Sequence, residues 1–226
     1  MGFSNGTPTI STDGLIFAVD AGNGQSYVSG SLDTFNLVSS DTGSIHNDVD
    51  FSSANQGSWA FDGADDNINF GTNIGNKLGD GVTTISVSLW FKCNDPNSND
   101  GIFSMGDFSS SVGVFTISTY LDAIYMRLNN TGFSQNEAFT DTTNWHHLVS
   151  IYDGSNGIMY LDNSEVINSA ASLTLDFDGK ITGIGTYYTI GGYSFNGNIA
   201  NCKIYNRVLT AAEVTKDYNA TKGRFI

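Results

Sequence analysis

The residues with the clearest capacity for chemistry are the carboxylates of one acidic turn. Asp62, Asp65 and Asp66 enclose a Gly-Ala pair and follow the apolar run at residues 59–61. Proteins bind calcium through several carboxylate and carbonyl oxygens, and this turn offers both. The competing interpretation is a turn that only ends a strand, because the short Asp side chain bonds nearby backbone amides. We predict a fold that requires no cofactor, with Asp62, Asp65 and Asp66 as candidate calcium ligands.

Catalysis would need paired carboxylates or a histidine cluster, and the sequence pattern favours neither. Glu137, Glu165 and Glu213 are the only glutamates and lie far apart in the chain, whereas a retaining glycosidase needs two carboxyl groups about 5 Å apart. His146 and His147 are adjacent in an expected strand, so their side chains point to opposite faces and cannot hold one ion together. We expect one of them to be buried and the other to face solvent. The sequence predicts a protein that is not an enzyme.

A group of aromatic residues near two glycine turns is the best candidate for ligand binding. Sugar recognition uses exposed aromatic side chains, which offer a large flat apolar area and, in tyrosine, a polar tip. The three tryptophans lie in strand-like patterns, which favours core packing for them. The competing interpretation of the other aromatics is also packing across the two sheets. The candidate ligand-binding residues are Tyr187, Tyr188, Tyr193 and Phe195.

The charge balance excludes two classes of partner. The 226 residues include 9 Lys and Arg against 23 Asp and Glu, for a formal net charge of −14. Binding to phosphate backbones and anionic lipid depends on clustered Lys and Arg, so nucleic acid and membranes are not expected partners. No run reaches the ~18 apolar residues needed to span a bilayer, and the first residues lack the pattern of a secretion signal.

Elements that would position these residues are mostly short strands. Residues 84–91 alternate apolar and mainly small polar side chains, the pattern of a strand with one face in the core. Residues 146–152 and 157–161 flank an Asp-Gly turn and predict a hairpin. A capping box, Thr210 with Glu213, predicts one late helix that Gly223 would end. These signals predict an all-β, two-sheet antiparallel jelly-roll sandwich with one short C-terminal helix, forming a single domain over residues 1–226.

Two further expectations concern a long segment and the cysteines. Residues 25–55 are polar and irregular, which predicts a surface excursion. Cys93 and Cys202 lie in apolar strand patterns, so buried free thiols are expected, although a bridge between distant strands stays open.

Several motifs lie at residues 14–23, 59–68, 84–91, 144–149, 152–162 and 197–210. Their order and spacing resemble the laminin G-like branch of the concanavalin A-like lectin/glucanase superfamily. This resemblance implies two facing antiparallel sheets, one of them concave. Glucanases on this scaffold typically carry a Glu-x-Asp-x-x-Glu strand, and none of the three glutamates stands in such a motif. Ala200 departs from the usual acidic residue, which weakens any metal site that the family builds there.

Residues 206–225 add a narrower resemblance, to the ends of such domains in structural proteins of tailed phages. It implies a virion protein exposed on the particle, as a head decoration or a tail or fibre component, assembled in a host cytoplasm. Its partners would be other virion proteins and copies of itself. The alternative is a lectin-like adhesion module, extracellular or on a cell surface, that binds a surface glycan. A glycan array would separate these two functions.

Overall fold

Two antiparallel sheets of eight strands each pack face to face in the computed structural model, which describes residues 9–106, 113–129, 132–187 and 193–226. In sheet A, the hydrogen-bonded strands follow one another in the order β14 (Ser164–Ala170), β13 (Asn156–Leu161), β12 (His146–Tyr152), β7 (Ile85–Cys93), β16 (Asn196–Tyr205), β5 (Ser58–Asp62) and β4 (Asp50–Ser52). The eighth strand, β1 (Leu15–Asp20), also pairs with β16. Sheet B runs β11 (Phe133–Ala138), β10 (Ala123–Leu128), β9 (Phe115–Thr119), β8 (Asp100–Met105), β15 (Thr182–Ile184), β6 (Asn67–Asn69), β3 (Thr42–His46) and β2 (Asp33–Phe35). The predicted sandwich is confirmed.

The core lies between the inner faces of the two sheets. In β7, Ile85, Val87, Leu89 and Phe91 belong to this core, as the alternation predicts. Sheet-on-sheet packing requires every strand to contribute alternate side chains in this way.

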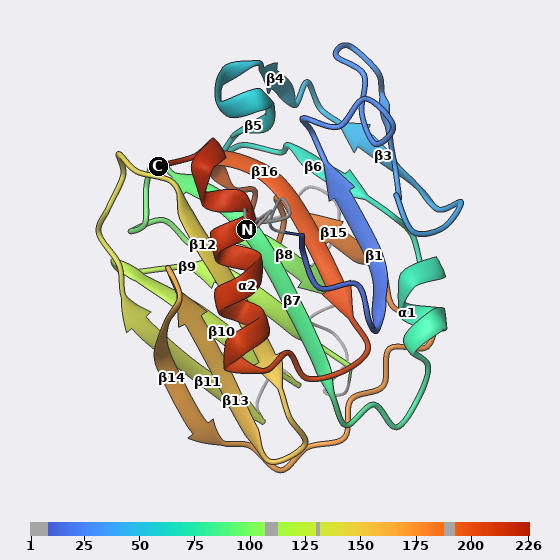
Figure 1. Cartoon of the computed structure of the whole chain (residues 1–226), viewed down its shortest axis with the longest axis vertical. Coiled ribbons are helices and arrows are strands. Elements are labelled where there is room, and N and C mark those ends of the chain that lie inside the picture. The colour runs from blue at the N-terminus through green and yellow to red at the C-terminus, as the bar shows by residue number, and fades with distance from the viewer. Residues whose placement is uncertain (1–8, 107–112, 130–131, 188–192) are drawn as a thin grey trace, which may run out of the picture.

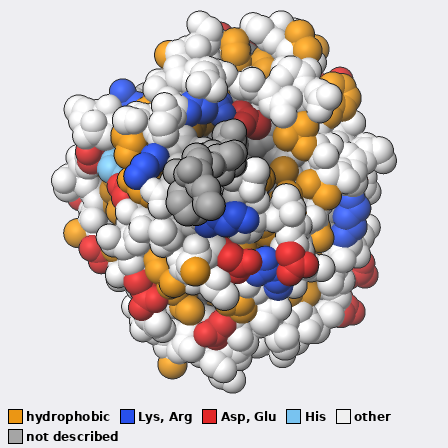
Figure 2. All heavy atoms as spheres, viewed as in Figure 1, with side chains coloured by type: hydrophobic (Ala, Val, Ile, Leu, Met, Phe, Trp, Pro, Cys, Tyr) orange, Lys and Arg blue, Asp and Glu red, His pale blue; other side chains and the backbone are white. Residues whose placement is uncertain are grey.

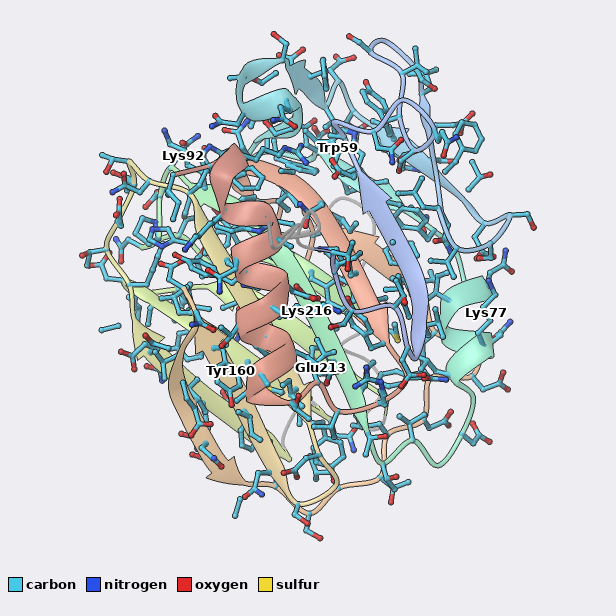
Figure 3. The ribbon with its side chains drawn as sticks, viewed as in Figure 1. Trp59, Lys77, Lys92, Tyr160, Glu213 and Lys216 are labelled. Atoms are coloured by element: carbon cyan, nitrogen blue, oxygen red, sulfur yellow. The ribbon has the colours of Figure 1, made fainter. Side chains whose placement is uncertain are left out.

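The outer face of sheet A is covered by the predicted helix, α2 (Ala211–Thr221), which crosses β7, β12 and β16 in Figure 1. The capping box is present as predicted, with the Glu213 amide donating to Thr210 Oγ1 and the Glu213 carboxylate accepting from the Thr210 amide. Glu213 and Lys216 lie along this helix in Figure 3. Trp90, on the outer face of β7, donates from Nε1 to Thr221 Oγ1 at 2.8 Å and stacks on Phe225. The outer face of sheet A therefore forms a second packed layer.

Two expectations need correction. The segment 25–55 contains β2, β3 and β4, so it joins both sheets instead of forming only an irregular excursion. Of His146 and His147, one is buried as expected, since His147 is 1% exposed beneath α2. The other does not face solvent as expected, because the His146 side chain is only 12% exposed and its ring lies against Phe91 and Phe139. The expectation of buried free thiols at Cys93 and Cys202 is confirmed.

The remaining elements are short. Helix α1 (Asn73–Leu78) and the 3-10 turns η1 (Ala54–Gln56) and η2 (Lys222–Arg224) lie outside the sheets. Of the helices in the described ranges, none is long and apolar enough to cross a membrane. Figure 2 shows acidic and basic side chains interspersed on the face that carries α2.

Candidate functional site

The outer face of sheet B carries two large polar side chains from one strand. In β10, Ile124, Met126 and Leu128 point into the core. Since successive side chains in a strand point to opposite faces, Tyr125 and Arg127 lie on the outer face. Tyr125 pairs with Ser118 of β9, and Arg127 is two positions further along the same face.

Arg127 is held between two tyrosine rings. Its guanidinium carbon lies 4.2 Å from the centre of the Tyr125 ring and 5.2 Å from that of Tyr187. Nη1 donates to Ser118 Oγ at 2.6 Å. Cation–π contacts with two rings and one hydrogen bond hold the guanidinium group in place.

A glycine in β8 brings the second tyrosine onto the sheet. A side chain at Gly101 would collide with the backbone of Thr186 and Tyr187, so only glycine allows this segment to lie directly on the strand. The Gly101 amide also donates to the Tyr193 carbonyl at 2.8 Å. The rings of Tyr187 and Tyr193 then meet edge to face, with centroids 5.9 Å apart.

These residues form a continuous row, which we call the tyrosine row. Its exposed ends are Tyr193, 54% exposed, and Tyr120, 38% exposed. Tyr120 precedes the turn into β10 and lies 6.3 Å from the Tyr125 ring, centre to centre. The row consists of Tyr120, Tyr125, Arg127, Tyr187 and Tyr193. An exposed aromatic edge on each side of a cation offers stacking surfaces and charged donors together.

The predicted ligand-binding residues fall in different surroundings. Tyr193 is exposed, whereas Tyr187 is 3% exposed and faces Arg127. The prediction of an exposed Phe195 is wrong, because its ring is fully buried against Phe61 and Phe91. Tyr188 lies outside the described residues. Whether any of them binds a ligand stays a prediction.

Sequence reasoning missed Tyr120, Tyr125 and Arg127. The signal was present, since Tyr125 and Arg127 alternate with three apolar residues in β10. Their shared face follows from period-2 alternation. Their contact with Tyr187 does not, because it depends on a segment about 60 residues further along the chain.

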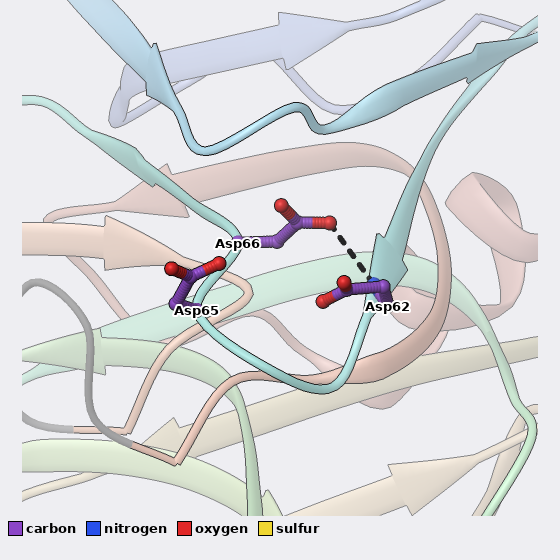
Figure 4. Close-up of side chains that lie close together, drawn as sticks. All are labelled: Asp62, Asp65 and Asp66. Atoms are coloured by element: carbon purple, nitrogen blue, oxygen red, sulfur yellow. Dashed lines mark hydrogen bonds between the residues drawn. The ribbon is translucent and has the colours of Figure 1, made fainter.

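The acidic turn gathers the three predicted aspartates at one rim of the sandwich. Figure 4 shows Asp65 and Asp66 on the turn between β5 and β6, beside Asp62 at the end of β5. One carboxylate oxygen from each lies within 4.8 Å of the others. Asp66 Oδ2 accepts from the Asp62 amide at 3.0 Å, and Asp62 Oδ1 accepts from the Ala64 amide.

Within this turn, the carboxyl of Asp66 has an unusual pKa. Burial raises the pKa of its carboxyl to about 6, and the nearby charges of Asp62, Asp65 and Asp48 add to the rise. The side chain is 2% exposed, and Oδ1 has no hydrogen-bond partner. A buried acceptor without a partner is costly unless a cation or a donor satisfies it. The donor set and this orphaned oxygen fit a calcium ion, which would take ligands from Asp62, Asp65 and Asp66.

The glutamates do not form a carboxylate pair among the described residues. Glu213 is paired with Arg207, and Glu165 accepts hydrogen bonds from Tyr160 and Asn168. Glu137 lies on β11, an edge strand of sheet B. His146 Nδ1 lies 2.6 Å from Asp162 Oδ2, but no serine or cysteine accompanies this pair in the described hydrogen bonds.

The family comparison agrees with this architecture. A family model described as the concanavalin A-like lectin/glucanases superfamily matches residues 62–215. A search of curated proteins finds no match.

Solved structures with the same fold include domains from three kinds of protein. One is domain 4 of an extracellular arabinanase from Geobacillus stearothermophilus, in complex with arabinotriose, with a TM-score of 0.65 and 15% identity over 92% of this chain and 98% of that one. The receptor-binding domain of botulinum neurotoxin type G has a TM-score of 0.68 and 16% identity, covering 92% of this chain and 51% of that one. A Trypanosoma rangeli sialidase in complex with sialic acid has a TM-score of 0.68 and 12% identity, covering 95% and 34%. The chain thus spans about half of the toxin domain and a third of the sialidase.

Proposed function

We propose that this chain, which belongs to the concanavalin A-like lectin/glucanase superfamily, is a carbohydrate-binding module that acts without catalysis of its own. The tyrosine row on the outer face of sheet B is the proposed binding surface. The observation that carries this proposal is the placement of exposed Tyr193 and Tyr120 at the two ends of a row centred on Arg127.

The chemistry of the row suits a sugar. Tyrosine rings present flat apolar faces that can stack on the C–H face of a pyranose, and their hydroxyl groups can reach its polar edge. Ser134 and Asn136 of β11 are exposed beside β10 and add hydrogen-bonding groups at the same sheet edge.

We propose that the chain does not hydrolyse the glycan because of where its carboxylates lie. Glu213 and Glu165 are engaged in side-chain contacts on α2 and β14, whereas acid–base hydrolysis of a glycoside needs two carboxyl groups across one bond. Incubation of the full chain with the best-bound polysaccharide should release no reducing sugar.

The proposal is tested by glycan-array screening of the full chain, followed by calorimetry with the best-bound oligosaccharide. We expect Tyr193→Ala and Tyr120→Ala each to weaken binding by about threefold to tenfold, because each removes one aromatic contact. Tyr193→Phe should keep most of the affinity, since it retains the ring.

Phe35→Ala is the matched control. Phe35 is also an exposed aromatic, at 46%, but it lies on β2 at the opposite edge of sheet B. Equal losses in Phe35→Ala and Tyr193→Ala, or no glycan bound at all, would contradict the proposed function.

We also propose that calcium binds at Asp62, Asp65 and Asp66. The ion would neutralise the clustered carboxylates and satisfy Asp66 Oδ1. This site lies at a rim of the sandwich, and the sugar-binding proposal does not depend on it.

Display on a virion, as predicted from the sequence, is not supported by the relatives named above. Binding a glycan is compatible with display on a particle or on a cell surface. Copurification with assembled particles would test the virion location.

A further inference from the structure

Arg127 differs from the other two arginines in its partners. Arg207 is paired with Asp13 and Glu213, and Arg224 is paired with Asp20. Among the described residues, Arg127 has no carboxylate partner, and only Ser118 accepts a hydrogen bond from it. In a chain of net charge −14, acidic partners are plentiful, so a half-buried arginine without one is notable.

Leaving this cation unpaired has an energetic consequence. A partly buried charge loses solvation, and the loss is offset when an anion with good geometry reaches it. The two stacked tyrosines and Ser118 already hold the guanidinium group in place, so a ligand need not order it. Preorganisation of this kind raises the affinity for the matching group.

We propose that the tyrosine row selects glycans that carry a carboxylate, such as a uronate or a sialate residue. This inference rests on the proposed function and adds the class of sugar. The planar guanidinium fork matches a carboxylate with two parallel hydrogen bonds, and Nη2 and Nε are not engaged by the described residues.

The flanking tyrosines favour a ligand in which the carboxylate is attached to a sugar ring. Exposed Tyr193 and Tyr120 lie on either side of the cation. A pyranose ring stacked on one of them would place a substituent near Arg127. A small inorganic anion would use the charge alone and leave both exposed rings without contact.

The test uses matched pairs of acidic and neutral ligands with the full chain. Oligogalacturonate is compared with its carboxyl-reduced form, and sialyllactose with lactose, by calorimetry. We expect at least one acidic ligand to bind about tenfold or more tighter than its neutral partner, as a charge-assisted hydrogen bond would give. The two pairs distinguish a uronate from a sialate source.

Substitutions distinguish a specific role of Arg127 from a general effect of positive charge. Arg127→Gln should reduce the preference for the acidic ligand to within about twofold, and Arg127→Lys should restore only part of it, because lysine keeps the charge but not the fork. Lys216→Gln is the matched control. It removes one positive charge from α2, on the outer face of sheet A, and should leave the preference unchanged.

Three outcomes would overturn the inference. Equal affinity for acidic and neutral ligands would remove the class preference while leaving the carbohydrate-binding function standing. A preference that survives in Arg127→Gln, with its melting temperature unchanged, would place the selectivity elsewhere. Competition by sulfate or phosphate at the affinity of the oligosaccharide would show an anion site without sugar recognition. If no glycan binds at all, the proposed function itself fails.

Discussion

Asp66 illustrates how a buried carboxyl can lower the stability of a fold. Its carboxyl is buried, close to other aspartates, and has one oxygen without a partner. The pKa of about 6 in the folded state lies above the ordinary value of 3.8. The proton is therefore held more tightly in the folded state, so stability falls as the pH rises from about 4 through 6. Above pH 6 the Asp66 carboxyl is mainly ionised in the folded state, and a bound cation would offset the cost of burying this charge.

Calcium at about 100 times its dissociation constant is predicted to raise the melting temperature by about 5–10 °C at pH 7.5. The rise should shrink at pH 5, where protonation of Asp66 competes with the metal. Differential scanning calorimetry with and without a chelator measures both.

Asp66→Asn should abolish most of the calcium-induced rise, because it removes the buried anionic ligand. Asp178→Asn, an exposed aspartate away from this turn, is the control and should keep the rise. A calcium response that is equal in both variants, or that is larger at pH 5, would contradict a metal centre at Asp66.

At the scale of elements, α2 depends on its first turn. Thr210 and Glu213 satisfy each other's backbone amides there, and the helix covers Trp90 and His147 of sheet A. Loss of an N-cap side chain commonly costs a helix about 1 kcal/mol. The cap thus contributes to the packing of the whole outer layer.

Thr210→Ala is expected to lower the free energy of unfolding by about 1 kcal/mol in urea titrations. Thr72→Ala is a matched control, because Thr72 is the N-cap of α1 but makes no side-chain capping bond. It should cost only a few tenths of that energy. Equal losses in the two variants would show that the capping bond of Thr210 is not responsible.

Gly101 positions the aromatic residues from β8. Gly101→Ala should displace the segment that carries Tyr187 and weaken glycan binding, since the added methyl group meets its backbone. Gly24→Ala is the control, because the space beside Gly24 is open. Normal glycan affinity in Gly101→Ala would show that the contact of Tyr187 with the sheet is dispensable.

Local patterns predicted the elements whose periodicity or capping was strong. The bounds of β12 and the start of α2 agree with the sequence prediction. The strands β2, β3 and β4 were missed because they have three to five residues each and little apolar alternation. They are fixed instead by pairing, such as that of Ile45 with Ile68, which a local pattern cannot reveal.

The two candidate sites also differ in how far a local sequence pattern could predict them. The acidic turn is contiguous in sequence, so its clustering was predictable. The tyrosine row joins β10, Tyr120 just after β9, and Tyr187 and Tyr193, and its assembly depends on tertiary packing. Phe195 was misplaced because its Gly- and Asn-rich neighbours suggested a loop, whereas it directly precedes β16 and packs in the core.

At the scale of the whole molecule, the two outer faces of the sandwich differ. The outer face of sheet A is covered by α2 and the C-terminal Phe225, with Trp90 and His147 buried below. The outer face of sheet B presents partly exposed Tyr125 and Arg127 between Tyr120 and Tyr193. This asymmetry leads us to assign packing to sheet A and ligand binding to sheet B.

A crystal structure of the full chain with the best-bound oligosaccharide tests this assignment most directly. We predict that the sugar lies on the outer face of sheet B, with one ring against Tyr193 or Tyr120 and a polar group within hydrogen-bond distance of Arg127. A sugar seated instead in the rim hollow lined by Tyr27, Leu32 and Phe51, with the tyrosine row untouched, would contradict the account.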